Sequence, residues 1–158
     1  GVNNPFRHKW KKATTVFLVG FFALQALLPF RYMLYPGELF WNEEGYRFSW
    51  RVMLMEKAGY ASFRIVDTEN NRSWEAKNYD YLTPNQEKMM STQPDMILEY
   101  AHFLESEAKQ QGVKNPEVYV DSFVSLNGSP STRFIDPLAN LGAQNPSLKH
   151  KTWILPFE

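Results

Sequence analysis

An uninterrupted apolar segment near the N-terminus dominates the hydrophobic pattern of this 158-residue chain. Residues 13–30, ATTVFLVGFFALQALLPF, contain no charged side chain and one glutamine. Eighteen helical residues at about 1.5 Å each reach about 27 Å, close to the roughly 30 Å of a bilayer's hydrocarbon core. Arg31 follows directly, and its long side chain can extend to the headgroups. The pattern predicts a transmembrane helix over 13–30, with Trp10 and Tyr32 as interfacial anchors.

The charges before this segment predict its orientation. Region 1–12 is basic, with Arg7, Lys9, Lys11 and Lys12, and the positive-inside rule places such a flank in the cytoplasm. Two other interpretations compete. A basic region followed by a short apolar stretch also describes a signal peptide, although no small-residue cleavage site follows here. A buried core helix is the other, but a helix that is apolar on every side needs a large protein to cover it.

Beyond residue 45 the pattern changes to the alternation that is typical of β-strands. From Tyr46 to Met55 apolar residues alternate, which predicts a first strand with Tyr46, Phe48, Trp50, Val52 and Leu54 on one face. A turn at 57–59 and a second strand over 60–67 would complete a hairpin. A polar turn at 69–72 then leads to a short third strand over 73–77.

Helix signals follow this strand group. Thr83 with Gln86 three residues later forms a capping box, and Pro84 suits the first helical position, so a helix is predicted from Pro84 to about Ser91. A longer helix is predicted from Pro94 to Gly112 by apolar residues at helical spacing. A strand over 118–126, a primed turn at Asn127-Gly128, a return strand over 132–136 and a last short strand over 152–157 complete the chain.

This order predicts an α+β fold with one N-terminal transmembrane helix and a β-rich extracytoplasmic head that carries two helices. The predicted regions are a basic cytoplasmic flank (1–12), the transmembrane helix (13–30), a joint between membrane and head (31–45) and the extracytoplasmic domain (46–158).

Composition narrows the possible functions. Seventeen basic and seventeen acidic side chains cancel, so no overall positive field favours a nucleic-acid partner. The chain has no cysteine, which excludes disulfides and thiol catalysis. None of the three histidines, His8, His102 and His150, stands at metal-ligand spacing, so we expect no metal site. Aromatic residues make up 16%, which suits a protein beside a membrane.

The segment after the apolar helix concentrates the candidate site residues. Glu43-Glu44 could form a general acid and base pair, although adjacent acids before a strand are more often solvated or paired with cations such as Arg47 or Arg51. Aromatic side chains here could line a substrate groove. For Phe48 and Trp50 a place in a sheet core is the better interpretation, whereas Trp41 and Tyr46 are the better functional candidates. Three methionines are expected to fill the core: Met89, Met90 and Met96.

Several motifs together resemble one family. These are Tyr35-Pro36-Gly37, the run Trp41 to Trp50 (WNEEGYRFSW), Leu82 to Gln86 (LTPNQ), Pro94 to Ile97 (PDMI), Val118 to Asn127 and Ile135-Asp136-Pro137. In this order they resemble the segment after the last membrane helices of vitamin K-dependent gamma-carboxylase and its bacterial relatives, the HTTM-domain proteins. The acidic pair is similar to the bacterial branch, while Val52 stands where the family usually has methionine.

The resemblance implies a reaction in which reduced vitamin K or a related quinol, oxygen and carbon dioxide convert peptide glutamate to gamma-carboxyglutamate. It places the quinol chemistry and its catalytic lysine in a membrane region upstream of the matched segment, so no catalytic residue or bound cofactor is assigned to this chain. It associates one segment with the glutamate substrate, and the candidate substrate-binding residues are Trp41, Asn42, Glu43, Glu44, Tyr46, Arg47, Ser49 and Trp50. The implied location is the bacterial inner membrane with a periplasmic or extracellular head.

Two hypotheses of different classes follow. In the first, the chain is the C-terminal, extracytoplasmic part of a carboxylase-like membrane enzyme that contacts upstream membrane helices and a glutamate-containing peptide. In the second, it is a non-catalytic anchored module that docks within a membrane protein complex. The second hypothesis predicts an exposed apolar patch on the head.

Overall fold

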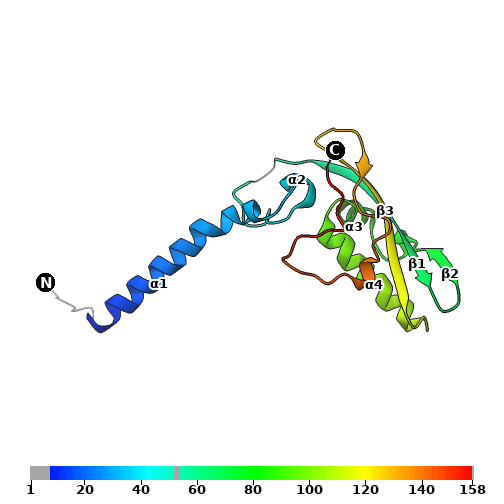
Figure 1. Ribbon diagram of the computed structural model, residues 1–158, viewed down its shortest axis with the longest axis horizontal. Coiled ribbons are helices and arrows are strands. Elements are labelled where there is room, and N and C mark those ends of the chain that lie inside the picture. The colour runs from blue at the N-terminus through cyan, green and yellow to red at the C-terminus, as the bar shows by residue number, and fades with distance from the viewer. Residues whose placement is uncertain (1–7, 52–53, 158) are drawn as a thin grey trace.

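A computed structural model describes residues 8–51 and 54–157, as a long N-terminal helix and a separate head (Figure 1). Helix α1 (His8–Leu27) continues into the 3-10 helix η1 (Leu28–Leu34). The winding changes at Pro29, which lacks the backbone N–H that a continuing α-helix needs. The stretch Trp10–Leu34 is long and apolar enough to cross a membrane, and 6% of its most apolar 18-residue window is buried. The predicted apolar helix is therefore confirmed.

The head is built on one antiparallel sheet. Its strands are β1 (Lys57–Asp67), β2 (Arg72–Glu75), β3 (Pro116–Leu126) and β4 (Thr132–Arg133), in the order β2-β1-β3-β4. The two long central strands pair along their whole length, from Lys57 opposite Leu126 to Asp67 opposite Pro116. Because the strands alternate sides, one face of the sheet carries apolar side chains and the other carries polar and aromatic ones.

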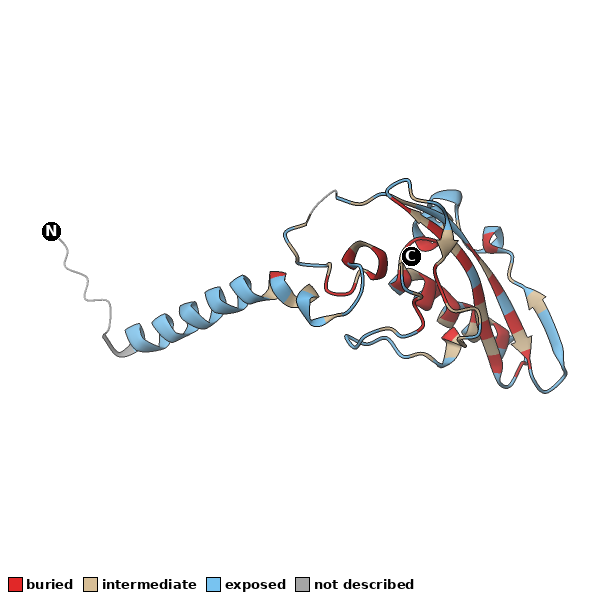
Figure 2. Cartoon of the chain, turned by 45° about the horizontal axis from the view of Figure 1, so that its top comes forward, coloured by how far each residue is buried: buried red, intermediate tan, exposed pale blue. Residues whose placement is uncertain are grey.

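Two helices cover the apolar face of the sheet, α3 (Pro84–Met90) and α4 (Pro94–Gln110). The shorter helical elements are α2 (Leu39–Asn42), η2 (Asn78–Asp80) and η3 (Leu141–Ala143). Figure 2 shows the buried residues gathered between α4 and the sheet, while α1 is exposed along its length. Fully buried Phe63 of β1 meets Tyr100 of α4 edge to face at 5.0 Å between ring centroids. The predicted α+β class is confirmed.

The predicted first strand from Tyr46 to Met55 is wrong where the structure describes it. Residues 46–49 form successive turns, in which the Tyr46 amide donates to Glu43 and the Ser49 amide donates to Tyr46. Phe48 has a positive φ of 68°, which no strand accepts. Phe48 and Trp50 are each 76% exposed, so their predicted place in a sheet core is also wrong. Val52 and Met53 lie outside the described residues.

The predicted turn at 57–59 is wrong as well, because these residues begin β1 and pair with β3. Gly59 allows this pairing, since a Cβ there would stand 2.3 Å from the carbonyl oxygen of Phe123. The strand over 60–67 therefore does not form the predicted hairpin with the segment 46–54. Its neighbours are β2, close to the predicted third strand, and β3.

The helix and turn signals in the second half of the chain are confirmed. The capping box of Thr83 and Gln86 is present, and α4 ends before Gly112, whose φ is +93°. Asn127 and Gly128 both have positive φ, as a primed turn requires. The return strand is shorter than predicted, and the predicted last strand is reduced to one bridge between Ile135 and Ile154.

The predicted core role of the methionines needs one correction. Met90 is buried, at 2% exposure, and Met96 packs partly buried against the core. Met89 is 53% exposed because it lies on the solvent side of the short helix α3.

Candidate functional site

The joint between α1 and the head is held by a short helical turn. Glu38 caps α2 by accepting a hydrogen bond from the amide of Phe40, and Glu43 ends it in the left-handed conformation with φ of 58°. Asn42 then fixes both sides of the turn, because its side-chain amide donates to Pro36 and its oxygen accepts from the amide of Glu44. Gly45 lies against η1 so closely that a Cβ would stand 2.6 Å from the Cα of Tyr32.

Trp41 anchors this turn in the core of the head. It is 1% exposed and stacks edge to face on Phe134, with 4.8 Å between ring centroids. Its indole Nε1–H donates to the carbonyl of Leu155 at 2.7 Å. With its one polar group, Nε1–H, already bonded and the ring almost fully buried, Trp41 holds the joint in place and offers a substrate very little surface.

Glu43 forms a buried ion pair with Lys57 at the start of β1. The Nζ of Lys57 lies 2.7 Å from Oε1 of Glu43 and 2.6 Å from the carbonyl oxygen of Trp41, and the two side chains are 5% and 17% exposed. Burial lowers the pKa of Lys57, and the neighbouring Glu43 carboxylate opposes that change. The pair ties the membrane joint to the central strand of the sheet.

Glu44 is tied to the C-terminal segment. Its side chain is 1% exposed, and its carboxylate lies 2.7 Å from Nδ1 of His150 and accepts from the backbone amide of Lys151. The segment around 144–151 returns from α4 towards α2 (Figure 1), and the hydroxyl of Tyr35 donates to Leu148 within it. The predicted pairing of the acids with Arg47 or Arg51 is therefore wrong: these carboxylates meet Lys57 and His150.

These contacts enclose a cavity of about 220 Å³, which we call the joint pocket. Its acidic lining residues are Glu43, Glu44 and Asp95, and the last of these also lies 2.9 Å from the Nζ of Lys151. The remaining lining consists of Arg31, Tyr35, Gly45, Arg47, Phe48, Ser147, Leu148, Lys149 and Lys151.

The cations of the joint pocket exceed the acids that are free to pair with them. Glu43 is paired from outside the pocket by Lys57, and the Glu44 carboxylate is hydrogen-bonded by His150 and by the backbone amide of Lys151. Within the described ranges 8–51 and 54–157, no ion pair is formed by Arg31 or Lys149, and the buried Nε of Arg31 has no hydrogen-bond partner. Arg47 contacts Asp95 only at 3.8 Å and is 68% exposed. The pocket therefore favours an anion.

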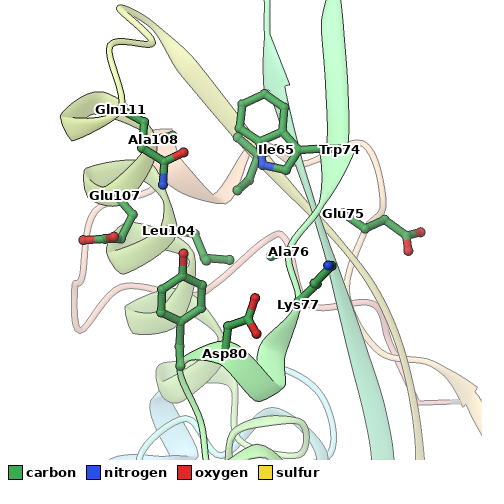
Figure 3. Close-up of a pocket in the computed structure, with 11 residues that line it drawn as sticks. Ile65, Trp74, Glu75, Ala76, Lys77, Asp80, Leu104, Glu107, Ala108 and Gln111 are labelled. Atoms are coloured by element: carbon green, nitrogen blue, oxygen red, sulfur yellow. The ribbon is translucent and has the colours of Figure 1, made fainter.

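A second cavity, also of about 220 Å³, lies between β2 and α4 (Figure 3). Its apolar wall is formed by Ile65, Trp74 and Leu104, and Figure 3 shows Lys77 and Asp80 below them, across from Glu107. Here two carboxylates, those of Asp80 and Glu107, stand around the cavity with one lysine, Lys77, whereas Glu75 points away from it (Figure 3). This is the reverse of the balance in the joint pocket. This cavity suits an anion poorly.

The predicted substrate-binding residues are divided by the structure. Glu43, Glu44 and Arg47 line the joint pocket, whereas Trp41 and Asn42 border a separate cavity of about 240 Å³ beside His150 and Phe157. Tyr46 is half-buried against Phe40, the hydroxyl of Ser49 donates to Tyr46, and Trp50 is exposed.

The sequence reasoning missed Arg31, Lys57, Asp95 and Lys149 as neighbours of this site. Arg31 was visible only as the charge that ends the apolar segment, and Lys57 as part of a supposed turn. Asp95 begins α4 and Lys149 lies near the C-terminus, so no local pattern connects them with residues 43–47.

Residues 10–158 match the family model described as vitamin K-dependent gamma-carboxylase, lumenal domain. The chain belongs to this family. The match covers the apolar helix, the joint and the whole head, so the elements described above are those of a carboxylase-type lumenal domain. No solved structure is significantly similar to the chain.

Membership in a lumenal-domain family and the exposed apolar helix α1 together indicate a membrane protein with an extracytoplasmic head. The joint pocket lies where the helix enters this lumenal domain, since Arg31 belongs to η1 and Asp95 to the first turn of α4.

Proposed function

We propose that this carboxylase-like extracytoplasmic portion engages a glutamate-containing peptide through the joint pocket, while the catalytic half of the enzyme lies in membrane helices upstream. The observation that carries the proposal is the excess of free cations in the pocket. Among the residues that the structure describes, Arg31 and Lys149 form no ion pair, and Arg47 contacts Asp95 only at 3.8 Å. The pocket's own carboxylates already have partners in Lys57, His150 and Lys151.

The other walls of the pocket match the rest of a glutamate side chain. A glutamate presents a carboxylate on two methylene groups, and Tyr35, Phe48 and Leu148 supply apolar surface beside the cations. The planar guanidinium of Arg31 can bind both carboxylate oxygens at once. Recognition would therefore combine a charge-assisted hydrogen bond with apolar contact along the stem.

We assign the binding of the quinol to the upstream membrane helices and not to the joint pocket. Seven of the twelve residues that line the joint pocket are charged, which suits a carboxylate better than the uncharged ring of a quinol. The proposed role of this chain is therefore limited to holding the peptide near the membrane.

Binding of short peptides to the intact polypeptide in nanodiscs tests this proposal. Arg31→Gln is expected to weaken binding of a glutamate peptide about tenfold or more, because a hydrogen bond to a charged group contributes about 1.5–3 kcal/mol. Lys149→Gln, at an exposed position, should weaken it a few-fold. Arg133→Gln, on β4 at the far side of the sheet, is the matched control and should bind normally.

A glutamine peptide serves as the ligand control and should bind weakly to all variants. Equal binding of the glutamate and glutamine peptides, or unchanged affinity in both Arg31→Gln and Lys149→Gln, would show that the joint pocket does not recognise the carboxylate.

We further propose a bacterial inner-membrane location with region 1–12 in the cytoplasm and the head in the periplasm. The basic residues before the apolar segment 13–30 support this orientation, and the likeness of Glu43-Glu44 to the bacterial branch supports the location. A reporter enzyme that is active only in the periplasm, fused after residue 158, should be active. Activity of a cytoplasm-only reporter at the same position would reverse the topology.

The second candidate function, docking within a membrane complex, is favoured by one observation. Phe48 and Trp50 are exposed on the head beside the end of α1, as the docking hypothesis predicts. Crosslinking from these positions to a second membrane protein, with no peptide binding, would support docking instead of substrate engagement.

A further inference from the structure

An exposed apolar surface lies where the head meets the end of the apolar helix. We call it the aromatic platform, and it consists of Phe30, Met33 and Leu34 of η1 with Phe48 and Trp50 of the following turns. Their exposed fractions are 50%, 70%, 80%, 76% and 76%, respectively. The two segments touch, because the rings of Phe30 and Trp50 meet edge to face at 6.3 Å between centroids. Through this contact the exposed apolar side chains of η1 continue onto the turns of the head.

The length of the helix fixes the depth of this surface in a bilayer. From Ala13, directly after the last lysine, to Leu27 the α-helix rises about 22 Å at about 1.5 Å per residue. The 3-10 helix adds about 2 Å per residue, so a hydrocarbon core of roughly 30 Å ends near Arg31. Phe30 is then at its boundary, and Trp50, in contact with Phe30, lies at the same level. A tilted helix would place both deeper.

The chemistry of the platform matches that level. Tryptophan and phenylalanine beside arginine are typical of the interface between hydrocarbon and headgroups. The guanidinium of Arg51 lies 4.5 Å from the centroid of the Tyr32 ring and donates to the Tyr32 hydroxyl, next to this surface.

The backbone supplies an independent observation. Phe48 is held at positive φ, a strained conformation for a bulky residue, and its side chain gains no compensating burial within the head. The Phe48 ring is therefore accessible from outside the head.

We propose that the aromatic platform inserts into the lipid interface of the outer leaflet as a second membrane contact beside α1. Two contacts, one on the helix and one on the turns 46–50, fix the orientation of the head on the bilayer. Because Arg31 and Phe48 also line the joint pocket, that pocket opens at the level of the headgroups. A ligand of the pocket therefore approaches along the membrane surface. The proposal depends on α1 crossing the membrane and is independent of which ligand the pocket binds.

Depth-dependent quenching of a fluorescent label tests the insertion. These 158 residues contain no cysteine. With any cysteine elsewhere in the intact polypeptide replaced by serine, Phe48→Cys and Trp50→Cys each provide one labelling site for an environment-sensitive nitrobenzoxadiazole (NBD) dye. Both positions are exposed, and folding should tolerate the change. Leu138→Cys, at an apolar residue that is 83% exposed in the loop after β4, is the matched control.

In phosphatidylcholine nanodiscs, labels at 48 and 50 should emit at shorter wavelength than the label at 138. They should also be quenched several-fold more strongly by lipids that carry a spin label near the top of the acyl chain. Emission and quenching equal to those at 138 would overturn the proposal. So would a label that is shielded from water but not quenched by any lipid, since that result would mean that protein covers the platform. Peptide binding is measured separately in the same preparations, so a failure of the carboxylate proposal is distinguishable from a failure of insertion.

Discussion

The ion pair between Lys57 and Glu43 allows the coupling between membrane joint and sheet to be measured. In Lys57→Met, the Glu43 carboxylate loses its cation and the carbonyl of Trp41 loses a donor at 2.6 Å. Removing one partner of a fully buried pair costs roughly 3–5 kcal/mol. Because the Glu43 side chain keeps 17% exposure and water can reach it, we expect the free energy of unfolding to fall by about 2–4 kcal/mol.

The assay is urea unfolding of the intact polypeptide in nanodiscs, followed by the fluorescence of tryptophan, since Trp41 is buried in the core beside Phe134. Glu43→Gln is measured alongside, because it leaves an unpaired ammonium group in the same place. The double variant should lose less than the sum of the single losses, with a coupling of about 1–3 kcal/mol. Additive losses, or losses below about 1 kcal/mol in both single variants, would refute this account of the joint.

The pH dependence of this pair has a defined sign. Burial holds the pKa of Lys57 in the folded state below its ordinary value of 10.5, so folding disfavours the charged form. The contribution of Lys57 to stability should therefore rise as the pH increases from the lowered pKa to 10.5 and be complete above that value. Lys57→Met should lack this rise when unfolding free energies are compared across that range, and an identical pH profile in the variant would contradict it.

Three other variants test separate parts of the structure. Hydrogen bonds from Asn70 hold the pKa of Asp67 below 3.8. The contribution of Asp67 to stability is therefore present above pH 3.8 and is lost as the pH falls through the lower, folded-state pKa. Asp67→Asn should flatten the acid limb of the curve of unfolding free energy against pH. Gly45→Ala would place a Cβ 2.6 Å from the Tyr32 backbone at a residue whose φ is +74°. It should lower the free energy of unfolding by more than about 1–2 kcal/mol and speed amide hydrogen exchange in the joint. An unchanged exchange pattern would contradict this. Thr83→Ala should cost about 1 kcal/mol in thermal unfolding through loss of the capping box, whereas Thr83→Ser should be nearly neutral; equal stability of both would contradict the cap.

The features of this chain that could be predicted from its sequence are local ones. The apolar helix could be predicted because no charge interrupts residues 13–30, and the two head helices because Thr83, Pro84, Pro94 and Gly112 mark their ends. The strands over 60–67 and 118–126 could be found from alternation, and the turn between β3 and β4 from Asn127-Gly128. Each of these signals acts within a few residues, where steric and hydrogen-bonding preferences decide the backbone.

Tertiary structure decided the rest. Alternation from Tyr46 onwards resembles a strand, but the positive φ at Glu43 and Phe48 turns the chain there, and β1 pairs instead with β3, beyond both helices. The candidate site depends on contacts of the same kind. Glu44 meets His150 across 106 positions of sequence, and Lys57 reaches Glu43 because the start of β1 contacts the joint at the Trp41 carbonyl. A side chain's charge partner is set by where folding brings two distant segments together, and no local pattern records that distance.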